Sequence, residues 1–301
     1  MQVFGYPKCD ATSFRIRGAV SYAAGMSITH GRAVVSRRLP VYAAGAVPVP
    51  YVIQGMSELI AQDTFWEDHA HPTHELMWNA YGASSTTVGD RTWAITPTIG
   101  LWMPAGTVHS ARTPAGTRYR TAQFGVHAVP PLAPGPVAVE ITPLLQLLLD
   151  RLDEPALPAA SRDLTERLVL DVLTPAPHEV LVRRPRSALL APVVAALDAD
   201  PGDPRALADW AVALGVSPRT LTRAFRAETG LSLGRWQAAV RVQRAVLLLA
   251  AGASVEETAD VVGYRSASAF GAAFRRETGR TPGRFRPAED VPIAMTDVPD
   301  A

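Results

Sequence analysis

The sequence has almost no cysteine or lysine and no long apolar run. Cys9 is the only cysteine among 301 residues, so no disulfide can form within one chain. That suits a reducing compartment, and we expect a cytoplasmic location. No run of about 18 apolar residues occurs, so we expect no membrane span and no membrane partner. The first residues also lack the basic and apolar regions of a secretory signal.

Lys8 is the only lysine, so arginine carries nearly all the positive charge, and its distribution is uneven. Residues 186–286 contain 14 arginines and 9 acidic residues, a net charge of +5, which leaves −4 for the rest of the chain. A basic C-terminal domain beside a mildly acidic remainder favours a nucleic-acid partner. Charge alone fits an ordinary charged surface equally well.

The first half of the chain divides into an unpatterned segment and a segment of short strands. Residues 1–55 show no sustained period, and we expect them to be disordered; as a hypothesis, Met56 is the natural start. Residues 56–136 alternate strand-like stretches with glycine turns and end in a proline-rich break, which predicts a small all-β barrel or sandwich. The clearest strand-like stretches are 75–78, 85–88 and 92–95.

Residues 137–185 are expected to form a linker with two helices. The stretch 143–152 is leucine-rich, and in the next helix Leu164, Leu168 and Val172 share one face. This stripe packs either on its own barrel or on a second copy, and we favour a homodimer. Residues 186–287 are expected to be helical throughout, and residues 288–301 form a tail.

The helical region contains an internal repeat. Phe225-Arg-Ala-Glu-Thr-Gly230 recurs as Phe274-Arg-Arg-Glu-Thr-Gly279, and a first helix ends at Gly215 in one copy and at Gly263 in the other. Ser217-Pro218 is a cap followed by a helix start, and 254–257 is a capping box. A long helix, 233–251, joins the copies. Each copy therefore has the pattern of a helix-turn-helix, and a helical bundle that binds no DNA is the alternative.

The sequence from Ser254 to Phe270, with 274–279 and 281–286, resembles the signature of the AraC/XylS family of transcription regulators. The resemblance covers about residues 188–287. It implies a seven-helix domain with two helix-turn-helix units, double-stranded DNA and RNA polymerase as partners, and activation more often than repression.

We expect DNA contacts from both units, with unequal roles. Arg219, Thr220, Thr222 and Arg223 lie early in the first recognition helix and are expected to read bases. The arginines expected to hold phosphates are Arg226, Arg265, Arg275, Arg276 and Arg284, with Ser266 and Ser268 as further contacts. The second recognition helix offers Ala267, Ser268, Gly271 and Ala272 instead. We therefore predict that the first unit supplies most specificity and the second mainly anchors.

The strand region resembles the cupin motifs. His69-Ala-His71, Glu75 and Gly82 match the first motif in full, and 104–109 with His109 match part of the second; Gly100 lies two residues closer to Pro104 than usual. The resemblance implies a small β-barrel in which the three histidines and Glu75 converge. The predicted fold therefore has two domains. An N-terminal all-β, cupin-like barrel is followed by linker helices and by a C-terminal all-α domain with two helix-turn-helix units.

Three histidines and a carboxylate suit one divalent transition metal. An HxH spacing puts both imidazoles on one face of a strand, and His74 is an alternative ligand. The alternative is that these side chains line a pocket for an organic effector, with Trp78, Trp93, Trp102 and Met103 around the same cavity.

The predicted function is therefore a sequence-specific transcription regulator controlled by a small molecule or metal in the barrel. Two alternatives remain: a metal-dependent cupin enzyme fused to a DNA-binding domain, and a DNA-binding protein that senses no ligand.

Overall fold

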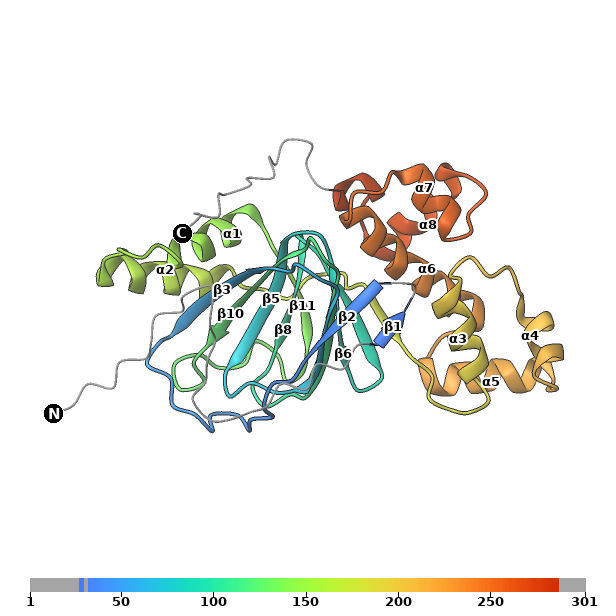
Figure 1. Cartoon of the computed structure of the whole chain (residues 1–301), viewed down its shortest axis with the longest axis horizontal. Helices are drawn as coiled ribbons and strands as arrows, with labels where there is room; N and C mark the ends of the chain where they lie inside the picture. Colours follow the sequence, from blue (N-terminus) through green and yellow to red (C-terminus); the bar gives the residue numbers. More distant parts are fainter. Residues whose placement is uncertain (1–26, 30–31, 287–301) are drawn as a thin grey trace.

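The computed structural model describes residues 27–29 and 32–286, and these form a β domain, a helical hairpin and a helical C-terminal domain (Figure 1). None of the helices in these residues is long and apolar enough to cross a membrane.

Two sheets form the β domain. The larger has the order β1-β2-β4-β9-β6-β7-β12, and the smaller has the order β11-β8-β5-β10-β3. Neighbouring strands are antiparallel except β2 and β4, which are parallel. The strands are β1 (Ser27–Thr29), β2 (Arg32–Arg37), β3 (Ile53–Leu59), β4 (Thr64–His69), β5 (His74–Tyr81), β6 (Ser84–Val88), β7 (Arg91–Ile95), β8 (Ile99–Met103), β9 (His109–Thr113), β10 (Arg118–Phe124), β11 (Val137–Glu140) and β12 (Leu181–Arg183).

The space between the sheets is one apolar core. Trp66, Trp93 and Ala111 come from the larger sheet, while Met77 and Leu101 come from the smaller. Because side chains alternate along a strand, the neighbours of these residues face outward. The predicted strands and glycine turns are confirmed here, and Gly82 between β5 and β6 has φ +78°, a conformation that other residues rarely adopt.

Two helices cover the outer face of the smaller sheet: α1 (Pro143–Leu152) and α2 (Ala159–Val172). Leu145, Leu149 and Val169 pack on Trp78 and Trp102 of that sheet. Arg120 of β10 forms ion pairs with Asp150 and Asp153 of α1, which fixes the hairpin to the sheet. Leu164 and Leu168 are exposed, so these two leucines of the predicted stripe do not pack on their own barrel.

The β domain is longer than the sequence predicted. β11 and β12 lie in the segment expected to be a linker, and β12 pairs with β7. The prediction that residues 1–55 are disordered is wrong for residues 32–55. There, β2 pairs with β4, and the Tyr42 N–H donates to the Ala70 carbonyl at 3.0 Å. β2 was missed because its six residues, which pair with β1 and with β4, show no alternation of apolar and polar side chains in the sequence. Residues 1–26, 30–31 and 287–301 lie outside the described residues, and Met56 lies inside β3.

The C-terminal domain contains the expected repeat of helices. They are α3 (Ala191–Ala199), α4 (Leu207–Ala213), α5 (Pro218–Thr229), α6 (Leu233–Ala250), α7 (Val255–Val261), α8 (Ala267–Thr278) and the 3₁₀ turn η1 (Pro282–Phe285). Ser217 caps α5, Ser254 and Glu257 form the predicted capping box of α7, and α5 and α8 end at the left-handed Gly230 and Gly279. Helices α4–α5 and α7–α8 are thus two helix-turn-helix units joined by α6.

The helical domain packs against the edge of the β domain opposite α1 and α2 (Figure 1). Ala94, Ile99 and Val180 of the β domain share a core with Val242 and Val246 of α6. The buried side-chain amide of Gln243 donates to the Thr92 carbonyl of β7 at 2.8 Å, and the Trp236 indole N–H donates to the Arg183 carbonyl at 2.7 Å. One strand, β7, therefore borders both domains.

Candidate functional site

Three histidines meet at one end of the β domain. His69 ends β4 and lies opposite His109, the first residue of β9; His71 follows β4 in the loop before β5. One ligand-capable nitrogen from each ring lies within 4.8 Å of the others. The ring centroids of His69 and His109 are 4.2 Å apart. The three histidines thus lie together, as the resemblance to the cupin motifs implies.

Backbone carbonyls set the orientation of two of the rings. Nδ1 of His69 lies 2.7 Å from the Glu67 carbonyl oxygen, and Nδ1 of His109 lies 3.0 Å from the Thr107 carbonyl oxygen. A carbonyl only accepts, so Nδ1 of each ring is the protonated nitrogen, and Nε2 of the neutral ring carries the lone pair. This arrangement is typical of histidines that ligate metals.

Glu75 of β5 completes the cluster. Its Oε2 atom lies 3.4 Å from Nε2 of His71 and 3.7 Å from Nε2 of His109. This oxygen is buried and has no hydrogen-bond partner among the described residues. A buried carboxylate oxygen without a partner carries a desolvation cost that a bound cation would offset. Glu75 therefore lies beside two of the three histidines, His71 and His109.

Burial controls the protonation of the cluster. It lowers the pKa of His71 and of His109 to about 4, lowers the pKa of His69, and raises the pKa of Glu75. Desolvation disfavours the charged form of each group. The three imidazoles are consequently neutral near pH 7, which is the form that binds a metal.

Strand alternation separates the predicted pocket residues into two groups. Trp93 and Met103 face the core between the sheets, as the histidines do. Trp78 and Trp102 face α1 and α2 on the other side of the smaller sheet, so their prediction as pocket residues is wrong. His74 also lies on that side: it stacks on Trp102 at 5.4 Å, and its Nδ1 accepts from the Ala105 N–H. His74 is therefore not an alternative ligand.

Sequence patterns missed two aromatic residues of the core between the sheets and one amide beside Glu75. Trp66 and Tyr119 face the same core, with ring centroids 5.4 Å apart. Gln123 of β10 donates to Glu75 Oε1 at 2.8 Å. Only the alternation of β10, read with its pairing to β5, would have placed Tyr119 and Gln123 on the inner face.

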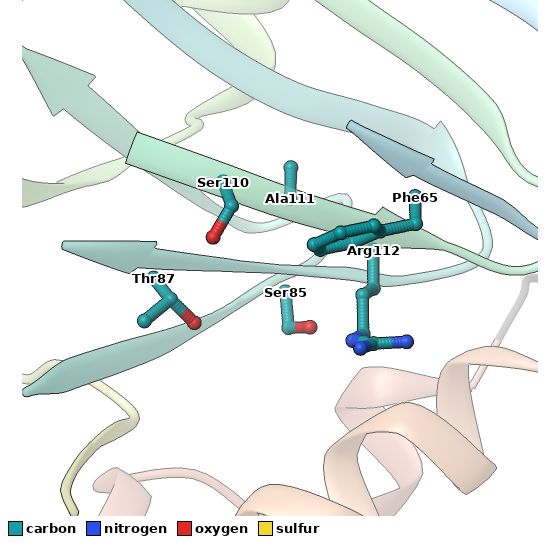
Figure 2. Close-up of a pocket in the computed structure, with 6 residues that line it drawn as sticks. All are labelled: Phe65, Ser85, Thr87, Ser110, Ala111 and Arg112. Atoms are coloured by element: carbon teal, nitrogen blue, oxygen red, sulfur yellow. The ribbon is translucent and has the colours of Figure 1, made fainter. Parts of the chain in front are cut away.

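An open groove of about 190 Å³ lies on the larger sheet. Figure 2 shows its lining: Phe65, Ser85, Thr87, Ser110, Ala111 and Arg112. The Arg112 guanidinium lies 4.5 Å from the centre of the Phe65 ring. This shallow polar groove contains none of the four clustered residues.

The predicted DNA-contacting arginines lie on the two recognition helices or just before them. Arg219, Arg223 and Arg226 on α5 are exposed, as are Arg265 before α8 and Arg275 on it. None of these five forms an ion pair with a described residue, so their charges are available to phosphates or bases. Arg276, also predicted to contact phosphate, pairs with Glu277 at 3.1 Å.

The predicted hydroxyl contacts differ in availability. Ser268 is exposed. Ser266 caps α8 by accepting from the Ala269 N–H, and Thr222 donates to the Pro218 carbonyl. Thr220 shares a hydrogen bond with Ser217. Arginine is therefore the main free donor on α5.

Two family models match the two domains. The helix-turn-helix domain matches residues 210–288, and the AraC-like ligand binding domain matches residues 55–190. The chain belongs to the AraC family. This member of the AraC family is a helix-turn-helix transcription regulator with an N-terminal ligand-binding domain and a C-terminal DNA-binding domain.

Its curated relatives are named as transcriptional regulators. It is 28% identical to NimR of Escherichia coli over 226 residues, which covers 72% of this chain and 81% of NimR. It is 43% identical to RipA of Corynebacterium glutamicum over 93 residues, 31% of this chain and 28% of RipA.

Solved structures of similar proteins match one domain or most of the chain. ToxT from Vibrio cholerae matches 78% of this chain and 96% of its own, with 9% identity and a TM-score of 0.33. The DNA-binding domain of AdpA, solved in complex with a target DNA, matches 33% of this chain and 91% of its own, with 34% identity and a TM-score of 0.31.

Proposed function

We propose that this AraC-family regulator is controlled by a divalent transition metal bound inside its β domain, as the signal itself or as the anchor of a small-molecule effector. One observation carries the proposal: the unpartnered Oε2 atom of Glu75 is buried beside Nε2 of His71 and of His109. Neutral imidazoles and one carboxylate are a donor set for zinc, iron, nickel, copper or manganese.

The residues that would hold the metal are His69, His71, His109 and Glu75. The metal would supply a positive charge that stabilises the carboxylate and a Lewis-acidic position for an effector with an oxygen or nitrogen donor. The protein's part is to keep the imidazoles neutral through burial and to orient the His69 and His109 rings through the Glu67 and Thr107 carbonyls.

Elemental mass spectrometry of protein purified without chelator or added metal tests this function. We expect about one equivalent of one transition metal per chain in the wild type, and little in a folded His71→Ala variant. A wild-type protein without metal that also takes up none on addition would contradict the proposal, and an organic effector alone would then be the better account.

An enzyme fused to a DNA-binding domain is the competing function class. The relatives named above are transcriptional regulators, which supports regulation without catalysis. We therefore infer that the metal serves binding and that the chain is no enzyme.

We further propose double-stranded DNA, a second copy of the chain and RNA polymerase as partners, in the cytoplasm. Four exposed leucines support the second copy, because no other part of the monomer packs on them: Leu144 and Leu147 on α1, and Leu164 and Leu168 on α2. Light scattering of wild type and a Leu147→Asp/Leu168→Asp variant decides this: a wild-type protein that is already monomeric would contradict it.

We infer that β7 carries the signal between the domains. Trp93 and Ile95 face the core that adjoins the histidines, whereas Ala94 faces α6 and the Thr92 carbonyl binds Gln243. A ligand that moves β7 thus changes the surface on which α6 packs, and α6 is the helix that joins both DNA-binding units. The ligand can shift this equilibrium only by the difference in its affinity for the two states.

A further inference from the structure

The carboxylate of Glu75 is held by a side chain from the neighbouring strand. Glu75 and Gln123 are directly opposed in the antiparallel pair of β5 and β10. The Gln123 Nε2 atom donates to Glu75 Oε1 at 2.8 Å, and the Thr73 hydroxyl donates to Gln123 Oε1. The carboxylate can only accept here, so the amide nitrogen must face Glu75, and the Thr73 hydroxyl then satisfies the amide oxygen.

This chain of hydrogen bonds determines which oxygen of Glu75 faces the histidines. Oε1 is occupied by the amide, and Oε2 is left as the unpartnered atom near Nε2 of His71 and of His109. A glutamate has several rotamers of similar energy, so a free Glu75 would lose entropy on binding a cation. The opposed amide selects one of these orientations in advance.

We propose that Gln123 is a positioning residue that presents Glu75 Oε2 to a cation held by His69, His71 and His109. This inference rests on the metal site proposed above. It adds that the affinity of the site for the cation depends on Gln123, which does not itself contact the metal. Thr73 contributes to that affinity by holding Gln123. With Oε1 engaged by the amide, Glu75 offers a single oxygen.

Cobalt(II) binding to the full-length protein tests the role of Gln123. The variants are Gln123→Met, which keeps the length and removes the donor, and Thr73→Val, which frees the amide but leaves it in place. The matched control is Gln237→Met, since Gln237 is a buried glutamine whose amide donates to the Arg205 carbonyl inside the helical domain, whereas Gln123 is partly buried. Affinity is measured by competition with a chelator, and the visible spectrum reports the ligand set.

We expect Gln123→Met to bind cobalt about 10- to 100-fold more weakly than the wild type and with a changed spectrum. Thr73→Val should weaken binding by a smaller factor, and Gln237→Met should leave affinity and spectrum unchanged. A purely structural role would lower the melting temperature without cobalt but leave the cobalt-bound spectrum unchanged.

The failure of this inference differs from that of the metal site itself. A wild-type protein that binds no cobalt would overturn the metal site. Cobalt binding that His71→Ala abolishes, with wild-type affinity and spectrum in Gln123→Met, would overturn the positioning role alone. If Gln123→Met does not fold, unchanged affinity in Thr73→Val overturns the role, and weakened affinity with an altered spectrum supports it.

Discussion

At the scale of single residues, the buried histidines make the stability of the metal-free protein depend on pH. The pKa of His71 and of His109 is about 4 in the folded chain and near 6.5 in the unfolded chain. Between these values the unfolded chain binds protons that the folded chain does not. The free energy of unfolding is therefore highest above pH 6.5 and decreases as the pH falls towards 4.

We expect the free energy of unfolding in excess chelator to decrease from pH 6.5 to 4, by at most about 1.4 kcal/mol per pH unit for each histidine. Urea titrations at several pH values measure this. In His109→Gln the dependence should be shallower, because one buried imidazole is gone. The same slope in wild type and variant would show that other groups cause it.

The residues also show how far sequence reasoning reaches at this scale. HxH spacing correctly placed His69 and His71 close together, with ring centroids 5.0 Å apart, although His71 lies in the loop after β4 rather than on the strand. Trp78 and Trp102 were assigned to the wrong face because a strand buried on both sides has no polar alternation that identifies the inner face. Gln123 could not be found, since its role depends on the pairing of β10 with β5, a contact 48 residues apart in sequence.

At the scale of elements, the capping residues predicted the helix-turn-helix units well, because caps act within one turn of the chain. The strands at the margins, β2 and β12, were missed because each is stabilised by a distant partner rather than by its own sequence. The availability of the arginines on α5 could be anticipated only in part, since ion pairing depends on packing.

The recognition helix α5 leads to a prediction about DNA binding. Arg223→Ala should reduce discrimination between base pairs by about 1–3 kcal/mol at the contacted position. Arg226→Ala should weaken all sequences alike and flatten the slope of log K against log salt by about one unit. Arg235→Ala, an exposed arginine on α6 outside the recognition helices, is the control. Fluorescence anisotropy with substituted duplexes measures both effects, and a uniform loss in Arg223→Ala would refute base reading there.

At the scale of the whole molecule, the β domain and the helical domain share the wall formed by β7. Metal binding can influence DNA binding only if the metal-bound and the metal-free protein favour different arrangements of this wall and α6. The amide of Gln243, bound to the Thr92 carbonyl, is the buried polar contact that joins β7 to α6. This hydrogen bond forms only when α6 and β7 keep one relative position, whereas the apolar contacts around it tolerate small shifts of one domain against the other.

We therefore expect Gln243→Leu to uncouple the two sites. In the wild type the DNA dissociation constant should change by about 5- to 150-fold on addition of the metal, the usual range of allosteric coupling. In Gln243→Leu that ratio should approach one, with metal affinity and folding retained. Gln237→Leu, which changes a buried glutamine of the same helix that contacts only its own domain, should keep the wild-type ratio. Equal ratios in all three proteins would show that the signal takes another route, and the exposed leucines of α1 and α2 would then be the next elements to test.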